Sequence, residues 1–247
     1  SHCYFDYGLD ATDLKEVYNY EPIPAELTKE EAKHILGGEC NMWSERAPQE
    51  LVDSKVFPRI LAMSEVLWSY PSERDSSSIE NRVNAHYSLL ENMGVNFGIA
   101  VEPIALKSIN NSNPLKVKII PGESNLNFKY KWDSDSTMKQ PHQNLTLKIN
   151  QSGVLSIQAF KNKKPYGEIF LQEFSKNQAN QGSVEYTSTY SEFYESNRNH
   201  TLTDGKIGSL NFKDGNWQGF FGKDIECIID LKETISVSKV KSSFFQY

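Results

Sequence analysis

The sequence predicts an α/β segment over residues 1–97, followed by antiparallel β structure over the rest of the chain. Three observations carry this prediction. Strand-like and helix-like runs alternate in the first 97 residues, an order typical of a parallel sheet. After Gly98, apolar and polar residues alternate with period two between closely spaced turns, which is typical of a small antiparallel sandwich. Aromatic residues make up 12 % of the chain, a high share that suits β-sandwich cores and sugar stacking alike.

The composition excludes several classes of function. The net charge is −6 and no stretch concentrates Lys and Arg, so the basic surface that a nucleic-acid partner requires is absent. No apolar run reaches the roughly 20 residues of a transmembrane segment. The cysteines Cys3, Cys40 and Cys227 form no CxxC pair. Free thiols are the default expectation, with a Cys3–Cys40 disulfide as the less favoured alternative.

The first segment begins with two strand-like runs separated by a loop and a helix start. Cys3–Tyr7 is short and aromatic, and Ile35–Trp43 is longer. Between them, Thr28 and Glu31 stand at capping-box spacing, which predicts a helix start. Two parallel strands alone cannot form a domain, because their edges and one helix face stay uncovered. We therefore expect the rest of this domain to lie upstream of the chain or to be supplied by something else.

Two helices are predicted after the second strand. From Ser54 onward, apolar residues recur at helical spacing, and Pro58 falls in the first turn, where its missing N–H is tolerated. A second amphipathic run extends from Ile79 to Met93, and Gly94 follows as its expected C-cap.

Alternating runs predict the strands of two β modules. The strand candidates of the first module are residues 115–120, 127–132, 145–149 and 154–160. The polar residues 174–183 read as a linker. A second β-rich stretch runs from Val184 through residues 217–221 and 227–231 to residues 244–247, and we expect this end to be truncated as well.

Two predicted strand ends carry an aromatic residue and a carboxylate two positions apart. Tyr4 with Asp6, and Trp43 with Glu45, would each point to one face of a strand. An aromatic ring covers the apolar face of a sugar, and a carboxylate accepts hydrogen bonds from its hydroxyls. Taken alone, these residues favour the alternative in which Tyr4 and Trp43 are core residues and Asp6 and Glu45 cap turns.

The wider pattern resembles glycoside hydrolase family 20, the β-N-acetylhexosaminidases. The resemblance rests on spaced elements that agree in order: Tyr4–Asp6, Val17–Pro22, Gly37–Glu45, Phe57–Arg59 and Ala62–Ser69. It implies that residues 1–97 are the C-terminal strands and helices of a (β/α)8 TIM barrel, whose strand ends line the active site.

The resemblance also implies roles for the four residues. Tyr4 would hydrogen-bond the acetamido oxygen of a terminal N-acetylhexosamine, Asp6 and Glu45 would bind its outer hydroxyls, and Trp43 would form part of the pocket wall. Three helix residues are read as structural: Arg59, Glu65 and Trp68, the first two as an ion pair.

No catalytic residue is expected in this chain. The family is known for substrate-assisted retention, in which the acetamido oxygen of the substrate attacks the anomeric carbon and an adjacent Asp-Glu pair orients it and protonates the leaving oxygen. The sequence contains no Asp-Glu dipeptide. The resemblance therefore places the general acid upstream of Ser1, and it implies that this chain alone is inactive and that catalysis requires no cofactor.

The β modules resemble companions of such barrels. Residues 98–176 resemble a fibronectin-III-like sandwich, and residues 177–247 resemble the first part of a discoidin-like (F5/8 type C) sandwich. The resemblance makes Asp204 a candidate ligand of a structural calcium, although Asp-Gly is first of all a turn former. Asp214 carries the same ambiguity, and Trp217 is expected to be a core residue.

The leading interpretation is the C-terminal portion of an exo-acting β-N-acetylhexosaminidase. Its partners would be N-acetylhexosamine-terminated glycans and the missing part of the barrel, in a periplasmic, cell-surface or secreted setting that the family implies. One alternative is a non-catalytic glycan-binding or spacer fragment. Another is an unrelated hydrolase that uses Asp6 and Glu45 as an acid/base pair, which would require both carboxyls within reach of one bond.

Overall fold

The computed structural model describes residues 3–110, 112, 114–142, 144–180 and 182–246. The chain divides into two compact units, Ser1–Pro103 and Ile104–Tyr247. The division falls a few residues after the predicted boundary at 97/98. The boundary predicted at 176/177 lies inside the second compact unit. Each unit is described by itself below.

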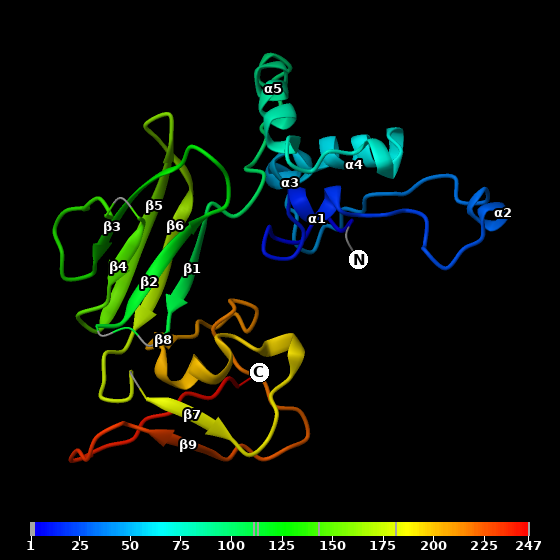
Figure 1. Ribbon diagram of the computed structural model, residues 1–247. Coiled ribbons are helices and arrows are strands. Elements are labelled where there is room, and N and C mark those ends of the chain that lie inside the picture. The colour runs from blue at the N-terminus through cyan, green and yellow to red at the C-terminus, as the bar shows by residue number, and fades with distance from the viewer. Residues whose placement is uncertain (1–2, 111, 113, 143, 181, 247) are drawn as a thin grey trace. The chain divides into compact units, whose positions relative to one another are not determined.

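The first unit is helical and builds its core on short segments (Figure 1). Its helices are α1 (Leu14–Tyr18), α2 (Lys29–Ala32), η1 (Gln49–Leu51), α3 (Val52–Val56), α4 (Arg59–Trp68), η2 (Pro71–Glu73) and α5 (Ile79–Asn92). Helix α1 packs against α4. The core gathers Phe5, Leu14, Val17 and Met63 with Val83 of α5, so the first residues of the chain are held by the helices that follow.

The two predicted strands do not form, but the two segments do run parallel where they meet. The described segments meet at a single parallel bridge between Tyr4 and Asn41. Phe5 N–H donates to Asn41 O and Asn41 N–H donates to Cys3 O, both over 2.8 Å. A strand requires a continued ladder of such hydrogen bonds, and after Tyr4 the chain turns instead, with Tyr7 N–H donating to Tyr4 O.

The helix predicted from Ser54 is divided in two. Helix α3 ends at Val56, and α4 begins at Arg59. Between them, Phe57 is extended and the Phe57–Pro58 peptide is cis, so Pro58 precedes α4 rather than lying within a first turn. A proline disfavours the helical conformation of the residue before it, which explains the break. The helix predicted over 79–93 is confirmed by α5, and Gly94 follows it at φ +72°.

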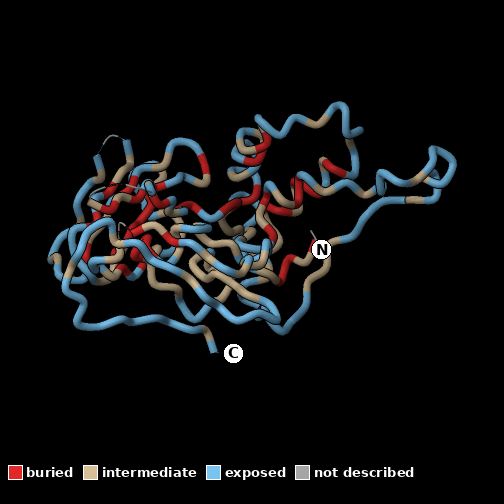
Figure 2. The backbone as a smooth tube through the Cα atoms, turned by 60° about the horizontal axis from the view of Figure 1, so that its bottom comes forward, coloured by how far each residue is buried: buried red, intermediate tan, exposed pale blue. Residues whose placement is uncertain are grey.

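Helix α2 confirms the predicted capping box. The Thr28 hydroxyl accepts from Glu31 N–H, and the Glu31 carboxylate accepts from Thr28 N–H. The helix lies on an excursion of residues 21–40 away from the core of the first unit, and almost all of this excursion is exposed or half-buried (Figures 1 and 2). Local hydrogen bonds, and not burial, therefore hold α2.

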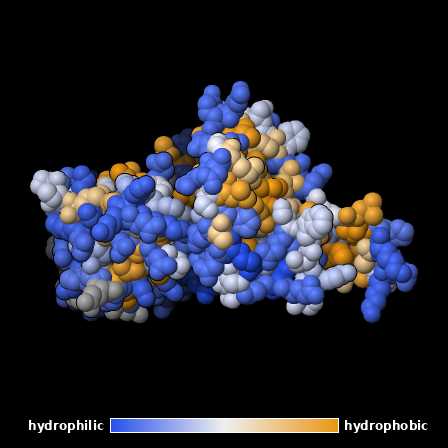
Figure 3. Space-filling model, turned by 90° about the horizontal axis from the view of Figure 1, so that it is seen from above, coloured by the Kyte–Doolittle hydropathy of each residue, from blue (hydrophilic) through white to orange (hydrophobic). Residues whose placement is uncertain are grey.

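Large apolar side chains also reach the surface of the first unit. Trp68, predicted to be structural, is 90 % exposed, and Leu36 is 98 % exposed. Figure 3 shows hydrophobic residues gathered in patches among hydrophilic ones on the viewed face. No helix in the described part of the chain is long and apolar enough to cross a membrane.

The second unit contains two antiparallel sheets that share one core (Figure 1). Sheet order is β1-β2-β4 in one and β3-β5-β6-β8 in the other. The strands are β1 (Ile104–Ile109), β2 (Lys116–Pro121), β3 (Asn127–Trp132), β4 (Thr146–Lys148), β5 (Gly153–Lys161), β6 (Lys164–Phe174) and β8 (Lys206–Ile207). The four predicted strands of the first module are thus confirmed as β2, β3, β4 and β5, and β1 and β6 are additional.

Period-two alternation explains this core. Val117 and Ile119 of β2 face inward from one sheet, and Phe128, Trp132 and Leu155 face inward from the other. The lysines between them in β2 and β3 point away from the core. One apolar face on each sheet therefore suffices to hold the sheets together.

The C-terminal residues form fewer strands than predicted. Strand β7 (Ser183–Tyr186) pairs with β9 (Cys227–Asp230), which confirms a strand at 227–231. Residues 217–221 and 244–246 are not in strands, and Tyr247 lies outside the described residues. Instead, the rings of Trp217 and Phe245 contact each other edge to face, 5.3 Å apart.

Candidate functional site

The residues predicted to bind the sugar lie on two segments joined by the Tyr4–Asn41 bridge. Tyr4 begins the turn that contains Asp6, and Trp43 and Glu45 follow Asn41 within four residues. Because residues 4–7 form a turn, Tyr4 and Asp6 do not alternate as neighbours on a strand. The structure thus brings the two segments together, but the expectation that Tyr4 and Asp6 share a strand face is wrong.

Asp6 is buried, with only 4 % of its surface exposed, although carboxylates are rarely buried without partners. Its Oδ1 atom has no hydrogen-bond partner among the described residues. An unsatisfied buried carboxylate oxygen is uncommon and calls for an explanation such as a ligand or an ordered water. Sequence reasoning selected Asp6 but did not predict this unused acceptor.

Two cations hold the backbone on either side of the Asp6 carboxylate. Arg59, 2 % exposed, donates from Nη2 to Phe5 O and from Nη1 to Thr12 O, the latter over 2.6 Å. Lys55 Nζ donates to Asp6 O over 2.8 Å. The ion pair predicted between Arg59 and Glu65 is therefore wrong, because the fork of donors on Arg59 is used by backbone carbonyls.

Burial and neighbouring charges shift the pKa values of Arg59 and Lys55. Burial lowers the pKa of Arg59 to about 10, and the nearby Asp6 carboxylate partly offsets this. Burial likewise lowers the pKa of Lys55, with Arg59 adding to the effect and Asp6 opposing it. The backbone at Asp6 therefore lies next to two cationic side chains.

Trp43 and Glu45 lie on the exposed side of the site. Trp43 is 53 % exposed and Glu45 is exposed as well, in a loop that precedes η1. An exposed indole beside a carboxylate can stack on a sugar ring and accept its hydroxyls. Neither residue is a core residue, so the alternative that made Trp43 part of the core is wrong.

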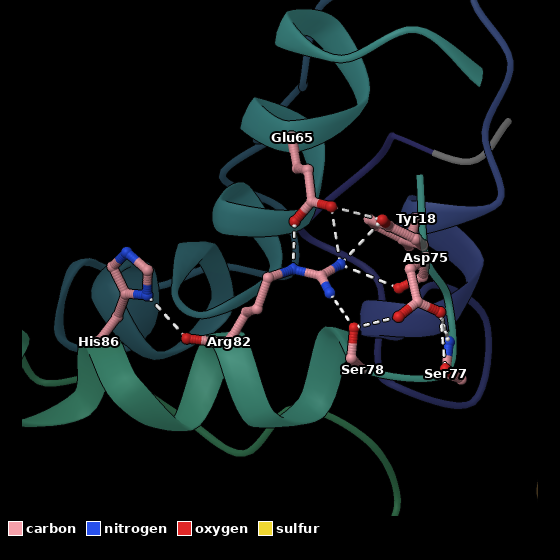
Figure 4. Close-up of polar contacts among 7 residues, drawn as sticks. All are labelled: Tyr18, Glu65, Asp75, Ser77, Ser78, Arg82 and His86. Carbon is pink, nitrogen blue, oxygen red and sulfur yellow. Dashed lines mark hydrogen bonds and ion pairs between the residues drawn. The ribbon is translucent and has the colours of Figure 1, made fainter. Parts of the chain in front are cut away.

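A polar network joins the helices behind this site (Figure 4). Arg82 of α5 donates from Nε and Nη2 to the two carboxylate oxygens of Glu65 on α4. The Tyr18 hydroxyl donates to the same carboxylate over 2.5 Å. Burial alone would raise the pKa of Glu65, but the hydrogen bonds from Arg82 and Tyr18 prevail and lower it. The network therefore joins α1, α4 and α5.

Asp204 in the second unit lies in a different setting from that expected of a calcium ligand. It is buried, and Lys206 N–H donates to its Oδ1 over 3.0 Å. Asn197 Nδ2 and Ser108 Oγ donate to Oδ2 over 3.1 and 3.4 Å. Burial raises the pKa of Asp204, while the neighbouring Lys206 opposes this rise.

The space beside Asp204 is also small. Asp204, His200 and Thr203 line a cavity of about 10 Å³, room for about one water. Across the described residues, no group of three or more His, Cys, Asp or Glu side chains could hold a metal ion. Because both oxygens of Asp204 already accept hydrogen bonds and Lys206 balances its charge, these donors do not fit a divalent cation. Calcium binding by this module stays an untested prediction, as does any role for Asp214.

A known family matches part of the first unit. Residues 2–71 match the family model of the catalytic domain of glycosyl hydrolase family 20. The chain is 31 % identical over 87 residues to a beta-hexosaminidase of Porphyromonas gingivalis, covering 35 % of this chain and 11 % of that protein.

Two further relatives give the same picture. A probable beta-hexosaminidase of Drosophila melanogaster is 34 % identical over 92 residues, covering 36 % of this chain and 14 % of the relative. A beta-hexosaminidase subunit beta of Sus scrofa is 32 % identical over 101 residues, covering 41 % of this chain and 18 % of the relative. The chain thus spans less than a fifth of the length of these curated relatives.

Proposed function

From the premise that residues 2–71 are a segment of a glycosyl hydrolase family 20 catalytic domain, we propose that this chain is the C-terminal portion of an exo-acting β-N-acetylhexosaminidase. The parent protein removes terminal N-acetylhexosamine from glycans with retention of configuration. This chain contributes one side of the sugar pocket. Its partners are therefore glycans that end in N-acetylhexosamine, and the rest of the barrel completes the site.

The observation that carries this proposal is the buried Asp6 carboxylate with its unused oxygen, inside the matched segment. A sugar hydroxyl that donates to the Asp6 carboxylate would satisfy it. This requires that ligand binding or the rest of the barrel open a path to Oδ1, because solvent does not reach this atom here. Arg59 and Lys55 hold the surrounding backbone in place. Trp43 and Glu45, exposed on the adjoining loop, add the stacking surface and a second acceptor.

The proposed reaction is substrate-assisted. The acetamido oxygen of the substrate attacks the anomeric carbon, and a general acid protonates the leaving oxygen, so the enzyme needs no nucleophile of its own. The sequence has no Asp-Glu dipeptide to supply that acid, which supports its placement outside this chain. Tyr4 would hydrogen-bond the acetamido oxygen and Asp6 and Glu45 the outer hydroxyls. The catalytic step requires no cofactor.

The test uses the parent enzyme and a chromogenic N-acetylglucosaminide. Asp6→Asn and Glu45→Gln should raise KM about 10-fold or more, because hydrogen bonds to charged groups contribute about 1.5–3 kcal/mol. Asp10→Asn and Glu50→Gln alter exposed carboxylates close by and should leave KM unchanged. Unchanged KM in both site variants would overturn the assignment. The isolated chain should show no turnover, and turnover by it would contradict the placement of the general acid.

The second unit of this chain would carry accessory modules of the parent protein. The antiparallel orders β1-β2-β4 and β3-β5-β6-β8 suit the fibronectin-III-like module proposed for residues 98–176, although β8 (Lys206–Ile207) comes from the residues that follow it. The discoidin-like module proposed for residues 177–247 rests on sequence resemblance. A periplasmic, cell-surface or secreted location follows from the same resemblance, and fractionation of cells that express the parent would test it.

A non-catalytic glycan-binding or spacer protein is the second candidate function. It is favoured only by the absence of an Asp-Glu dipeptide in this chain. If the parent lacks such a pair, it should bind N-acetylglucosamine through Asp6 and Glu45 without cleaving the chromogenic substrate. That outcome would replace the enzyme proposal and keep the binding site.

A further inference from the structure

Cys3 and Cys40 lie opposite each other across the parallel bridge of the first unit. Tyr4 and Asn41 are the bridged pair, and Cys3 and Cys40 are the residues immediately before them on the two segments. The hydrogen bonds from Phe5 N–H and Asn41 N–H, both 2.8 Å, set this register. Adjacent strands lie about 4.8 Å apart, which is within the Cα separation of about 4.4–6.8 Å that a disulfide spans.

The two cysteines also share one core. Cys3 belongs to the core of the first unit, Cys40 packs against it, and each thiol affects the pKa of the other. Cys3 is buried and Cys40 is half-buried. Cys227, the third thiol, lies on β9 in the second unit. The fold therefore selects one partner for Cys3 out of the two other cysteines.

We propose that Cys3 and Cys40 form a disulfide when the chain folds in the presence of a small-molecule disulfide such as oxidised glutathione. One cysteine thiolate attacks the glutathione disulfide, and a mixed disulfide forms as the first reduced glutathione leaves. The second cysteine thiolate then attacks the protein sulfur of that mixed disulfide, and the second glutathione leaves. Two protein thiols are oxidised, one glutathione disulfide is reduced to two thiols, and the cysteine protons pass to the departing thiolates.

Burial controls when this reaction takes place. It raises the pKa of the Cys40 thiol to about 12, with the neighbouring Cys3 adding to the rise, and it also raises the pKa of Cys3. The thiolate is the attacking form, and an exposed cysteine has a pKa of about 8.5. The link should therefore form rapidly in the unfolded or opening chain and slowly in the folded one.

The link would join the two segments that carry the proposed sugar ligands. Tyr4 and Asp6 follow Cys3, and Trp43 and Glu45 follow Cys40. This consequence rests on the proposed function, but the link itself does not. Its test requires no sugar and no turnover, so a failure of the disulfide and a failure of the sugar site are separate results.

The experiment refolds the full chain in a mixture of reduced and oxidised glutathione and then alkylates the remaining thiols. Mass spectrometry should show one alkylated cysteine, Cys227, and a peptide in which Cys3 is joined to Cys40. Cys227→Ser should form the same link with no alkylated cysteine, whereas Cys40→Ser should form none. Alkylation of both Cys3 and Cys40, or a link that involves Cys227, would overturn the proposal.

A second measurement tests the proposal if the chain refolds poorly. The native chain is incubated with oxidised glutathione at neutral and at alkaline pH, without denaturant. The Cys3–Cys40 link should appear faster at the alkaline pH, since the thiolate fraction of both cysteines rises. If the native chain forms only mixed disulfides with glutathione at these two positions, the sulfurs are not placed to react with each other and the proposal fails.

Discussion

Arg82 donates two nearly parallel hydrogen bonds to the carboxylate of Glu65, from Nε over 2.9 Å and from Nη2 over 2.7 Å. This bidentate pair links α5 to α4, and the hydroxyl of Tyr18 on α1 donates to the same carboxylate (Figure 4). Fork-shaped pairs of this kind are stronger than single hydrogen bonds and define an orientation. Helices α1, α4 and α5 are thus joined at one acidic group.

Glu65→Gln should destabilise the chain by about 1–3 kcal/mol at neutral pH, the range for hydrogen bonds to charged groups. Its side chain is 25 % exposed, so the lower half of the range is expected. The pKa of Glu65 is lowered in the folded chain below its ordinary 4.5. Its stabilising contribution is therefore present above 4.5 and is lost as the pH falls through the folded-state pKa.

Urea denaturation of wild type and Glu65→Gln at neutral and at acidic pH checks this. The difference between the two should shrink at acidic pH, where both carry a neutral group. Glu91→Gln changes an exposed residue of α5 and serves as the control. A difference that stays constant with pH would mean that the charge of Glu65 contributes nothing.

Arg59→Lys should destabilise the first unit by about 2–4 kcal/mol, because several carbonyls near Asp6 would lose their donor in a buried place. Arg59 donates to Lys55 O over 2.8 Å as well as to Phe5 O and Thr12 O, and a lysine cannot reproduce this fork. Arg46→Lys changes an exposed arginine and is the matched control. Equal denaturation midpoints for both variants would contradict the role given to Arg59.

Gly208→Ala should destabilise the second unit by about 1–3 kcal/mol through overpacking. A Cβ atom at this position would lie 2.4 Å from Cε2 of the Trp217 ring, whose Nε1 is anchored on Ser209 O over 2.8 Å. Trp217→Leu in the same variant should recover part of the loss, since the ring is then absent. Thermal unfolding of the single and double variants measures this, and additive losses would refute the contact.

Oxidation of Cys3 and Cys40 should stabilise the first unit by about 3–4 kcal/mol, the chain-entropy value for a closed loop of about 37 residues. Urea denaturation with and without reductant measures the difference. Cys40→Ser should show no dependence on reductant. An unchanged urea midpoint of the wild type on reduction would contradict this prediction. The strain of the link in the folded state would then equal its effect on the entropy of the unfolded state.

The sequence predicted those elements that depend on interactions between residues close together in the chain. The capping box of Thr28 and Glu31, helix α5 with Gly94 after it, and the strands within residues 116–161 all follow from contacts between near neighbours or from period-two alternation. The family resemblance was likewise carried by residues within one continuous stretch, and residues 2–71 match that family. The break before Pro58 was locally encoded too, although the predicted helix ran across it.

The sequence by itself thus predicted many of the local elements and carried the resemblance to the family whose model residues 2–71 match. Only the tertiary structure decided that Arg59 donates to backbone carbonyls near Asp6 rather than to Glu65, and that Glu65 binds Arg82. It alone buried Asp6 with one unused oxygen. The physical reason is that a side chain of Arg, Glu or Asp can satisfy its hydrogen bonds with many partners. Packing between segments far apart in the sequence selects among them.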